Sequence, residues 1–594
     1  MTLEQILKTA TVEIFNQQFN AAISADAVTI NITNSDHDGD YTIVVFPLVK
    51  FSKKSPEQTA ELLGAQLKEK TNIIAGFNVI KGFLNLNLTD SYWLNRLKEI
   101  SDNAAYGTFP ANGKKVVLEY CGPNTNKPLH IGHLRNMLLG YSASEILKAA
   151  GFDVTKVNIY NDRGIAICKS MVAYKHYANG ATPQSTGIKG DHFMGDWYVK
   201  FNEIVNEQIK ALPEAPADKD EAQKLTPVFK EAQELLLKWE AGDEETVALW
   251  KKMNDWVYAG FQETFNLLGV DFQKDYYESE TYKLGRDLVN EGLEKNVFFR
   301  RKDGAVAVDL TPEGLDEKVL LRADGTSIYI TQDLATAKLR HEEFGMDKMI
   351  YVVANEQDYH FKVLKLALQK LGYGWADGIY HLSYALVESP TGRFKSREGK
   401  TADADDLIAE VLRIAEEKTK ELGKIEGFTT EEANVLYRTI GLGALKYFVL
   451  RVNPFKKIIF NPEESIDFHG HTGPFIQYTN ARIAAIIRRA GSLDALSADV
   501  IASYNLSGVE RELIILMSEY ENTVKVAAEK YDPSEIANYA YNLARTYNKF
   551  YHESPIISAP TETEKMVRVS LSAQTGVILK KGMKLLGIDV PEKM

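Results

Sequence analysis

Two histidines, His130 and His133, stand three positions apart in the stretch CGPNTNKPLHIGHLRN, with Gly132 between them. A β-branched run, KVVLEY (115–120), precedes this stretch, and a helical pattern of apolar residues over 132–151 follows it. The free N–H groups and the dipole of a helix N-terminus favour an anion, and both imidazoles can project over that anion. Imidazoles placed there can donate hydrogen bonds to a phosphoryl group as charge builds in its transition state. The residues therefore predict a nucleotide α-phosphate site.

The glycine and the surrounding pattern narrow this interpretation. Gly132 removes the side chain that would block a flat ring from lying on the backbone. The loop lacks both of the familiar glycine-rich phosphate-binding patterns, GxxxxGK[ST] and GxGxxG. A metal pair, or two partly exposed capping residues, are the alternatives for the histidines. The strand before them, the helix after them and a second cationic site downstream favour the phosphate site.

That second site is GRFKSREGK (392–400), which contains Lys395, Ser396 and Lys400. It follows a predicted strand that ends near Glu388 and precedes a predicted helix that starts near Asp403. A short cationic loop suits the pyrophosphate of ATP in a transition state. A solvated basic turn is the alternative interpretation.

The order of the patterns predicts a multidomain protein. Residues 1–110 combine helical periodicity with alternating strands, which indicates a small α+β domain. Residues 111–425 open with strand, helix and strand, a βαβ unit typical of a Rossmann-like parallel sheet, and 181–268 forms a helical insertion. Residues 426–594 are almost entirely helical. At 594 residues the chain is too long for a single core.

Composition excludes several classes of protein. The chain has a formal charge of −12 and only two cysteines, so neither a coat of positive charge nor a disulfide framework is expected. No run of about 18 apolar residues occurs, which predicts no membrane association. The first residues include Glu4 and Glu13 and have no basic start, so we expect no signal peptide and a cytoplasmic protein. Net charge leaves a nucleic-acid partner possible, because it says nothing of local patches.

The motifs resemble those of a known family. PNTNKPLHIGH is similar to the HIGH motif of class I aminoacyl-tRNA synthetases, and FKSREGK resembles a diverged KMSKS motif. The arginyl-tRNA synthetase family matches almost the whole chain, including YITQDLATA (329–337) and VVANEQDYHF (352–361). The resemblance implies ligation of L-arginine to tRNA(Arg) through an arginyl-adenylate. It also implies that the N-terminal domain grips the tRNA elbow and that a C-terminal bundle reads the anticodon.

The resemblance gives the residues roles. His130 and His133 stabilise the α-phosphate transition state, and the pyrophosphate charge meets Lys127, Lys395 and Lys400. Gly132 and Ser396 are assigned to ATP binding, with Mg²⁺ on ATP oxygens and no metal cage of the protein's own. The usual last lysine of KMSKS is absent, and Lys127 occupies the place of a lysine thought to substitute for it. The string YNDRG (160–164) departs from the family's usual Gly-Asp-Trp-Gly, so no role follows for it.

A guanidinium is planar and always charged, so its pocket should offer carboxylates and neutral acceptors. The resemblance places arginine-binding residues at Asn124, Glu280, Tyr329, Asp333 and Gln357. Glu278 lies two residues from Glu280 and is the alternative for the second acid.

The tRNA surface is predicted on the C-terminal helices, at Arg482, Arg488, Arg545 and Lys549. Tyr547 and Phe550 are interleaved with the last two, and bases of an anticodon loop stack on aromatic rings. The alternative for each aromatic residue is the core of the helical bundle.

Two rival functions stay open from the sequence alone. A synthetase for another amino acid would keep the histidine loop and change the pocket. A silent RNA-binding protein of synthetase descent would bind tRNA without pyrophosphate exchange, although both histidines and the lysines argue against it. We expect a monomer, and the resemblance implies that activation requires tRNA.

Overall fold

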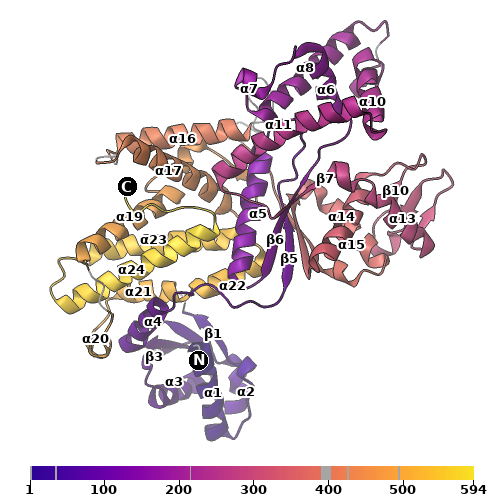
Figure 1. The fold of residues 1–594 in the computed structure, drawn as a ribbon. Coiled ribbons are helices and arrows are strands. Elements are labelled where there is room, and N and C mark those ends of the chain that lie inside the picture. Colours follow the sequence, from indigo (N-terminus) through magenta and orange to yellow (C-terminus); the bar gives the residue numbers. More distant parts are fainter. Residues whose placement is uncertain (1–2, 34–36, 215, 389–402, 424–426, 492–494) are drawn as a thin grey trace. The chain divides into compact units, whose positions relative to one another are not determined.

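The computed structural model divides the chain into two compact units (Figure 1). One comprises Met1–Tyr106, Ile483–Tyr520 and Arg545–Ile578, and the other comprises Gly107–Arg482, Glu521–Ala544 and Leu579–Met594. The residues that the structure describes are 3–33, 37–214, 216–388, 403–423, 427–491 and 495–594.

The first unit contains a four-stranded antiparallel sheet in the order β1-β2-β4-β3. Its strands are β1 (Thr29–Ile32), β2 (Tyr41–Val44), β3 (Ile74–Ile80) and β4 (Phe83–Leu88), and its first helices are α1 (Leu3–Phe19), α3 (Pro56–Lys70) and α4 (Asp90–Asp102). Leu84, Leu86 and Leu88 alternate along β4 and are fully buried, because a period of two puts them on one face. The predicted N-terminal α+β fold is confirmed.

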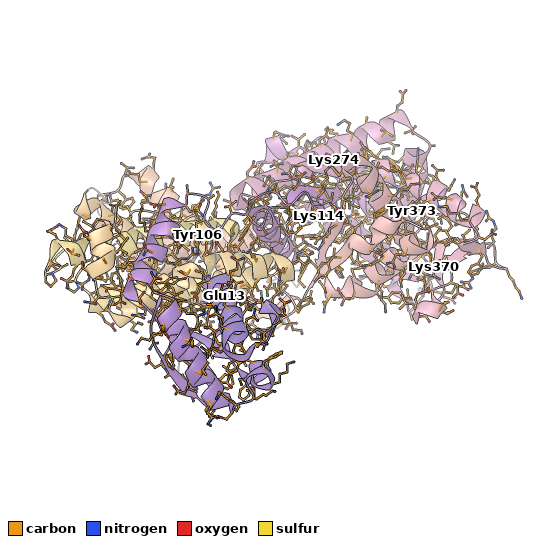
Figure 2. The ribbon with its side chains drawn as sticks, turned by 90° about the horizontal axis from the view of Figure 1, so that it is seen from below. Glu13, Tyr106, Lys114, Lys274, Lys370 and Tyr373 are labelled. Carbon is orange, nitrogen blue, oxygen red and sulfur yellow. The ribbon has the colours of Figure 1, made fainter. Side chains whose placement is uncertain are left out.

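Helices from late in the sequence belong to the same unit, among them α21 (Gly508–Ser518). On α21, Arg511 forms ion pairs with Asp40 at 3.3 Å and with Asp90 at 2.6 Å. The buried hydroxyl of Tyr106, labelled in Figure 2, donates to the carbonyl oxygen of Met517 at 2.9 Å. These contacts tie segments more than 400 positions apart into one body.

The second unit contains a five-stranded parallel sheet in the order β12-β11-β5-β6-β7. The strands are β5 (Lys115–Glu119), β6 (Asp153–Tyr160), β7 (Lys274–Tyr277), β11 (Lys348–Ala354) and β12 (Ile379–Tyr384). Val116, Val117 and Leu118 are buried, as expected for a strand covered on both faces. The predicted Rossmann-like sheet is confirmed.

The strand order reverses beside β5. Helix α5 (Ile131–Ala149) leads from β5 to β6 on one side, whereas β11 pairs with β5 on the other. Ligands of open parallel sheets bind outside the carboxyl ends of the strands at such a reversal. The loop with the two histidines follows the carboxyl end of β5, so the topology places it at this position.

A smaller antiparallel sheet lies between β7 and β11 in the sequence and has the order β10-β9-β8. Its strands are β8 (Phe298–Arg300), β9 (Val306–Val308) and β10 (Lys318–Leu321), and the helices of this region are α13 (Leu284–Glu294), α14 (Tyr329–Phe344) and α15 (Asp358–Lys370). Two residues labelled in Figure 2 form polar contacts within this region. Lys370 pairs with Glu313 at 2.8 Å, and the Tyr373 hydroxyl donates to Glu291 at 2.7 Å.

The segment between β6 and β7 contains a series of helices. Its helices are α6 (Ile165–Tyr177), α7 (Pro183–Thr186), α8 (Gly190–Lys210), α9 (Lys219–Lys224), α10 (Pro227–Glu240) and α11 (Glu244–Leu268). The regular helical structure thus begins at Ile165, earlier than the predicted insertion at 181.

After β12, the residues that the structure describes are mostly helical, and they include two short strands, β13 (Val387–Glu388) and β14 (Ile458–Ile459). The helices of this part are α16 (Ala404–Glu421), α17 (Thr430–Leu450), α18 (Pro462–Ser465), α19 (Gly473–Ala490), α20 (Ala498–Ser503), α21, α22 (Tyr520–Lys530), α23 (Pro533–Glu553) and α24 (Glu562–Leu585). The predicted helical C-terminal part is confirmed. The domain boundaries at 110 and 425 stay predictions.

Candidate active site

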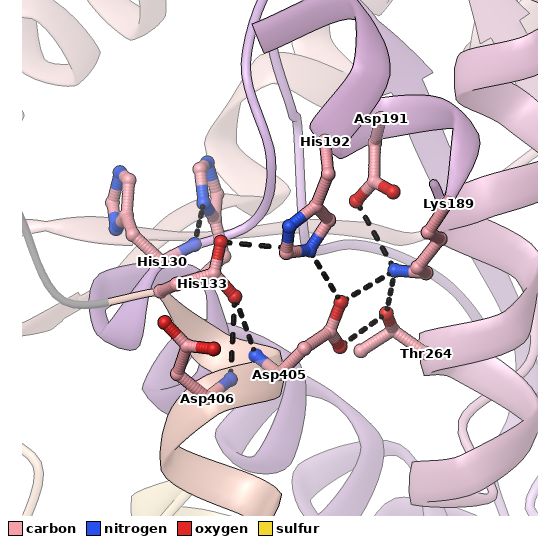
Figure 3. A network of polar contacts seen from close by, with 9 residues as sticks. His130, His133, Lys189, Asp191, His192, Thr264, Asp405 and Asp406 are labelled. Atoms are coloured by element: carbon pink, nitrogen blue, oxygen red, sulfur yellow. Dashed lines mark hydrogen bonds and ion pairs between the residues drawn. The ribbon is translucent and has the colours of Figure 1, made fainter. Parts of the chain in front are cut away.

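The two histidines are held by hydrogen bonds at the start of α5 (Figure 3). His130 is the N-cap residue, and its Nδ1 accepts a hydrogen bond from the Gly132 N–H at 3.1 Å. The His130 N–H donates to Nδ1 of His133 at 3.1 Å, and the ring centroids are 3.9 Å apart. A neutral imidazole that accepts at Nδ1 carries its proton on Nε2. Both rings therefore have an Nε2–H available as a donor.

Burial keeps these rings neutral. Burial and the charge of Lys127 lower the pKa of His130 to about 4. Burial also lowers the pKa of His133 well below its usual range, and His130 and Lys127 contribute in the same direction. The pKa of Lys127 is itself lowered by burial. The three residues thus lie close together, with two neutral donors beside one ammonium group.

Gly132 lies under the His130 ring. A Cβ atom at this position would come within 2.8 Å of Cε1 of His130. Any residue with a Cβ would therefore displace the His130 ring from its capping position, whereas glycine leaves room for the ring.

Asn136, on the next turn of α5, fastens the helix to the centre of the sheet. Its Oδ1 accepts from the Cys121 N–H at 2.6 Å, and its Nδ2 donates to the carbonyl oxygen of Val352 on β11 at 2.6 Å. Arg135 is also buried and donates to the carbonyl oxygens of Pro454 and Lys456, both at 3.0 Å. The sequence predicted no role for Arg135 or Asn136, although both stand at the end of CGPNTNKPLHIGHLRN (121–136).

A second polar group lies on α14 and α15. Nε2 of His360 is 2.6 Å from Oδ2 of Asp333. Nearby, the fully buried guanidinium of Arg340 pairs with Glu119 at the carboxyl end of β5. Burial raises the pKa of Glu119, and the positive charge of Arg340 opposes this rise. The negative charge of Asp333 also raises the pKa of Glu119. Asp333 is therefore close to the carboxyl edge of the sheet.

The two acids proposed for the same pocket differ in their surroundings. Glu278 is 9% exposed, accepts from Nε2 of Gln332 at 3.3 Å and lies 4.0 Å from Arg163. Burial raises the pKa of Glu278, Arg163 opposes this shift, and Asp333 contributes to it. Glu280 is exposed. The structure therefore buries Glu278 within the field of Asp333 and leaves Glu280 exposed.

The other predicted arginine-binding residues lie at the ends of elements. Asn124 follows β5, is exposed and forms a backbone bridge with Asn161 after β6. Tyr329 is the first residue of α14 and is 77% exposed, and Gln357 is exposed just beyond β11. Among the described residues, no hydrogen bond or ion pair joins any of these three side chains to Asp333.

The string YNDRG is built into this region as well. Asp162 is buried and accepts from the Tyr258 hydroxyl at 3.0 Å and the Ser279 hydroxyl at 2.7 Å. The guanidinium of Arg163 lies 4.0 Å from the ring centroid of Tyr282. The sequence indicated no role for either residue because YNDRG departs from the family's usual string, and their partners on α11 and at α12 (Glu278–Thr281) come from other parts of the chain.

Three predicted ATP-site residues, Lys395, Ser396 and Lys400, lie outside the described residues. The predicted tRNA-binding residues lie on α19 and α23, where Arg482 is over the ring of Tyr478 at 4.9 Å and Arg488, Arg545 and Lys549 are exposed. Lys549 pairs with Glu512 at 3.4 Å. Tyr547 and Phe550 are fully buried, so these rings are core residues, the alternative left open for them.

A nucleotide-binding α/β domain is the class that the parallel sheet, the strand reversal and the histidine pair define. Residues 1–88 match the arginyl-tRNA synthetase N-terminal domain, 98–462 match the class I tRNA synthetase (R) catalytic domain, and 476–594 match the DALR anticodon-binding domain. The chain belongs to the arginyl-tRNA synthetase family.

Individual proteins match over the full length. The chain is 50% identical to the arginine–tRNA ligase of Parabacteroides distasonis, with 100% of both chains covered, and 50% identical to that of Bacteroides fragilis, with the same coverage. Among solved structures, it is similar to the arginyl-tRNA synthetase of Thermus thermophilus, with a TM-score of 0.80, 25% identity and complete coverage of both chains. No helix in the described parts of the chain is both long and apolar enough to cross a membrane.

Proposed function

We propose that this chain joins L-arginine to tRNA(Arg) in two steps. In the first, the arginine carboxylate attacks the α-phosphorus of ATP, and the bond to the pyrophosphate leaving group breaks. In the second, a terminal ribose hydroxyl of the tRNA attacks the arginyl carbonyl and AMP leaves. The observation that carries the proposal is the pair of neutral Nε2–H donors at the start of α5, beside the strand reversal.

The α-phosphate gains negative charge as the nucleophile approaches, so donors that are already oriented lower the barrier. His130 and His133 fill this role, and Gly132 lets the His130 ring lie on the helix start. Lys127 lies beside the two histidines, and we assign it to neutralising the negative charge of the pyrophosphate. Lys395, Ser396 and Lys400 are assigned to the same nucleotide from sequence alone.

Arginine binds near the carboxyl edge of the sheet, with Asp333 facing its guanidinium. The burial of Glu278 and its electrostatic coupling to Asp333 support Glu278 as the second acid. Glu280 is the alternative to Glu278 for this one role, and Asn124, Tyr329 and Gln357 stay predictions from the motif match. No enzyme nucleophile is needed, because the substrate carboxylate performs the attack.

Mg²⁺ accompanies ATP and supplies charge neutralisation at phosphate oxygens. Among the described residues, Asp191, His192 and Asp405 are near enough to one another to share an ion. Lys189 Nζ already lies 3.1 Å from Asp191 and 2.6 Å from Asp405. An ammonium group in that position does not fit a Mg²⁺ site, which supports a metal held mainly by ATP and water.

The matching family descriptions support tRNA as the partner. We assign Arg482, Arg488, Arg545 and Lys549 to phosphate contacts, and we expect a monomer that acts in the cytoplasm. The domain limits 1–110, 111–425 and 426–594 belong to the same proposal.

Aminoacylation with total tRNA and each of the twenty amino acids tests the proposal. Only arginine should be transferred, and transfer should require ATP. Charging of another amino acid with comparable kcat/KM, or tRNA binding without any charging, would replace the proposal with one of its two rivals.

A further inference from the structure

Asp405, in the first turn of α16, meets two helices of the insertion (Figure 3). Its Oδ2 lies 2.6 Å from Lys189 Nζ and 2.9 Å from His192 Nε2, and its Oδ1 accepts from the Thr264 hydroxyl at 2.8 Å. Lys189 precedes α8, His192 lies in its first turn, and Thr264 is on α11. We call Lys189, His192, Thr264 and Asp405 the α16 junction.

The insertion side of the junction is rigidly packed. A Cβ on Gly190 would lie 1.8 Å from the Trp256 carbonyl oxygen, and one on Gly260 would lie 2.4 Å from Oδ1 of Asp191. Only glycine allows α8 and α11 to approach this closely, so a larger residue would force the backbones apart. Lys189, next to Gly190, is therefore fixed in place by main-chain packing.

The other side of the junction leads directly to the histidine loop. Asp403 caps α16 by accepting from the Asp405 N–H at 2.8 Å. Its backbone forms an antiparallel bridge with His130, and the Ala404 N–H donates to the carbonyl oxygen of Leu129 at 3.0 Å. Asp405 therefore stands two positions after the residue whose backbone bridges to His130, with Ala404 alone between them.

We propose that Lys189, His192 and Asp405 are positioning residues for arginine activation. They hold the start of α16 against the insertion, and α16 in turn holds the backbone of His130. The inference rests on the proposed role of His130 and His133 at the α-phosphate. A structural ion pair alone would stabilise the fold, whereas a positioning contact also sets the orientation of the two donors in the transition state.

Electrostatics supports a charged junction. The hydrogen bond to Asp405 raises the pKa of His192 to about 9, burial opposes the shift, and Asp403 and Asp191 add to it. Burial disfavours the charged form of Asp405, yet hydrogen bonds from His192 and Lys189 hold its pKa well below the usual range. Among the described residues, Lys189, Glu263 and Thr264 line, together with His192, a pocket of about 380 Å³.

The test compares Lys189→Met, Lys189→Arg and Asp405→Asn in the full chain, by steady-state aminoacylation. Lys189→Met and Asp405→Asn should lower kcat on the order of 10- to 100-fold, the scale of a misplacement of about 1 Å, while KM for ATP and arginine changes little. Lys189→Arg keeps the charge and should recover most of kcat. The Lys189→Met/Asp405→Asn double variant should be no slower than the slower single variant, because both remove one contact.

Controls separate positioning from general damage. Lys200 on α8 forms an exposed ion pair with Glu203 at 3.2 Å, and Lys200→Met should retain wild-type kcat. His176 pairs with Glu231 at 2.8 Å on the surface, which makes His176→Gln the match for His192→Gln. In wild type, kcat should fall above about pH 9 as His192 loses its proton. His192→Gln should lack this fall, and His176→Gln should keep it.

Wild-type kcat in Lys189→Met and Asp405→Asn would overturn the proposal. It would also fail if Lys189→Arg were as slow as Lys189→Met, or if the losses multiplied in the double variant. His130→Ala is measured in parallel. If His130→Ala also retains full kcat, the α-phosphate assignment itself is wrong, whereas a slow His130→Ala beside fast junction variants contradicts only the positioning role.

Discussion

Nε2 of His360 lies 2.6 Å from the carboxylate of Asp333. Asp333 is on α14, which precedes β11 in the sequence, and His360 is on α15, which follows it. The His360 side chain is 20% exposed and that of Asp333 is 37% exposed, so the carboxylate is oriented by the protein and still open on one side. This arrangement leaves the other oxygen of Asp333 for a guanidinium. His360 was not among the residues that the sequence predicted, although it stands in VVANEQDYHF (352–361).

The first prediction concerns discrimination between arginine and citrulline. Citrulline has nearly the shape of arginine but no charge, and a site with unpaired acids can reject such an analogue by about 10⁴ to 10⁵. Asp333→Ala should cost arginine recognition roughly 2–5 kcal/mol, because bound arginine would cover the partly exposed carboxylate and form a buried charge pair with it. We would measure kcat/KM for arginine, citrulline and lysine. Equal use of citrulline and arginine by the wild type would contradict this pocket.

The second prediction separates the two candidate acids. Glu278 is buried within the field of Asp333, whereas Glu280 is exposed. Glu278→Gln should raise KM for arginine by about tenfold or more, equivalent to about 1.4 kcal/mol of binding. Glu280→Gln, the control two residues away, should leave KM unchanged. The reverse pattern would return the role to Glu280.

The third prediction concerns the histidines. His130→Ala and His133→Ala should each lower kcat for activation on the order of 10²-fold or more, because each removes a preoriented donor. KM for arginine should change little. Exchange of pyrophosphate into ATP should be measured with tRNA present and absent, since family resemblance predicts near-zero exchange without it. If both variants turn over at the wild-type rate, the histidines serve only as helix caps.

The residues of this site differ in how far the sequence could predict them. His130, Gly132 and His133 interact with one another within four positions, so local spacing was sufficient. Lys189 and Asp405 meet across 216 positions, and no local pattern signals such a pair. The contact of His360 with Asp333 likewise depends on how two helices pack around β11.

The fold shows the same division between local and tertiary information. Strand β5 was predictable because its apolar run matches a covered parallel strand. Strand β3 carries a weaker signal, because Gly76 interrupts its apolar pattern and the pairing with β4 shifts register between Ile74 and Gly76. Strand β7 reads KDYY and pairs only at the sheet edge with β6, so its pairing rather than its composition makes it a strand. Tertiary context overrides weak β-propensity at both positions.

The fourth prediction concerns tRNA binding. Arg545 and Lys549 are exposed on α23, one helical turn apart. Binding should weaken with salt despite the net charge of −12, because phosphate contacts release counterions locally. Arg545→Ala and Lys549→Ala should each reduce the slope of log Kd against log salt by about 1. Arg413→Ala is the control, since Arg413 is an exposed arginine on α16, outside the predicted tRNA surface. A slope that is the same in all four proteins would place α23 outside the interface.

The last prediction links stability to pH through His192. Its pKa is about 9 in the folded chain and about 6.5 when unfolded, so folding favours the protonated form. The resulting stabilisation is fully present below pH 6.5 and disappears as the pH rises through about 9. The shift corresponds to on the order of 1–3 kcal/mol, an upper range because the side chain is 29% exposed. The Tm of wild type should therefore exceed that of His192→Gln at pH 6, and the difference should shrink between pH 7 and pH 10. His176→Gln, which lies in an exposed pair, should show no such convergence. A wild-type advantage over His192→Gln that stays constant up to pH 10 would mean that His192 is not held as a cation by Asp405.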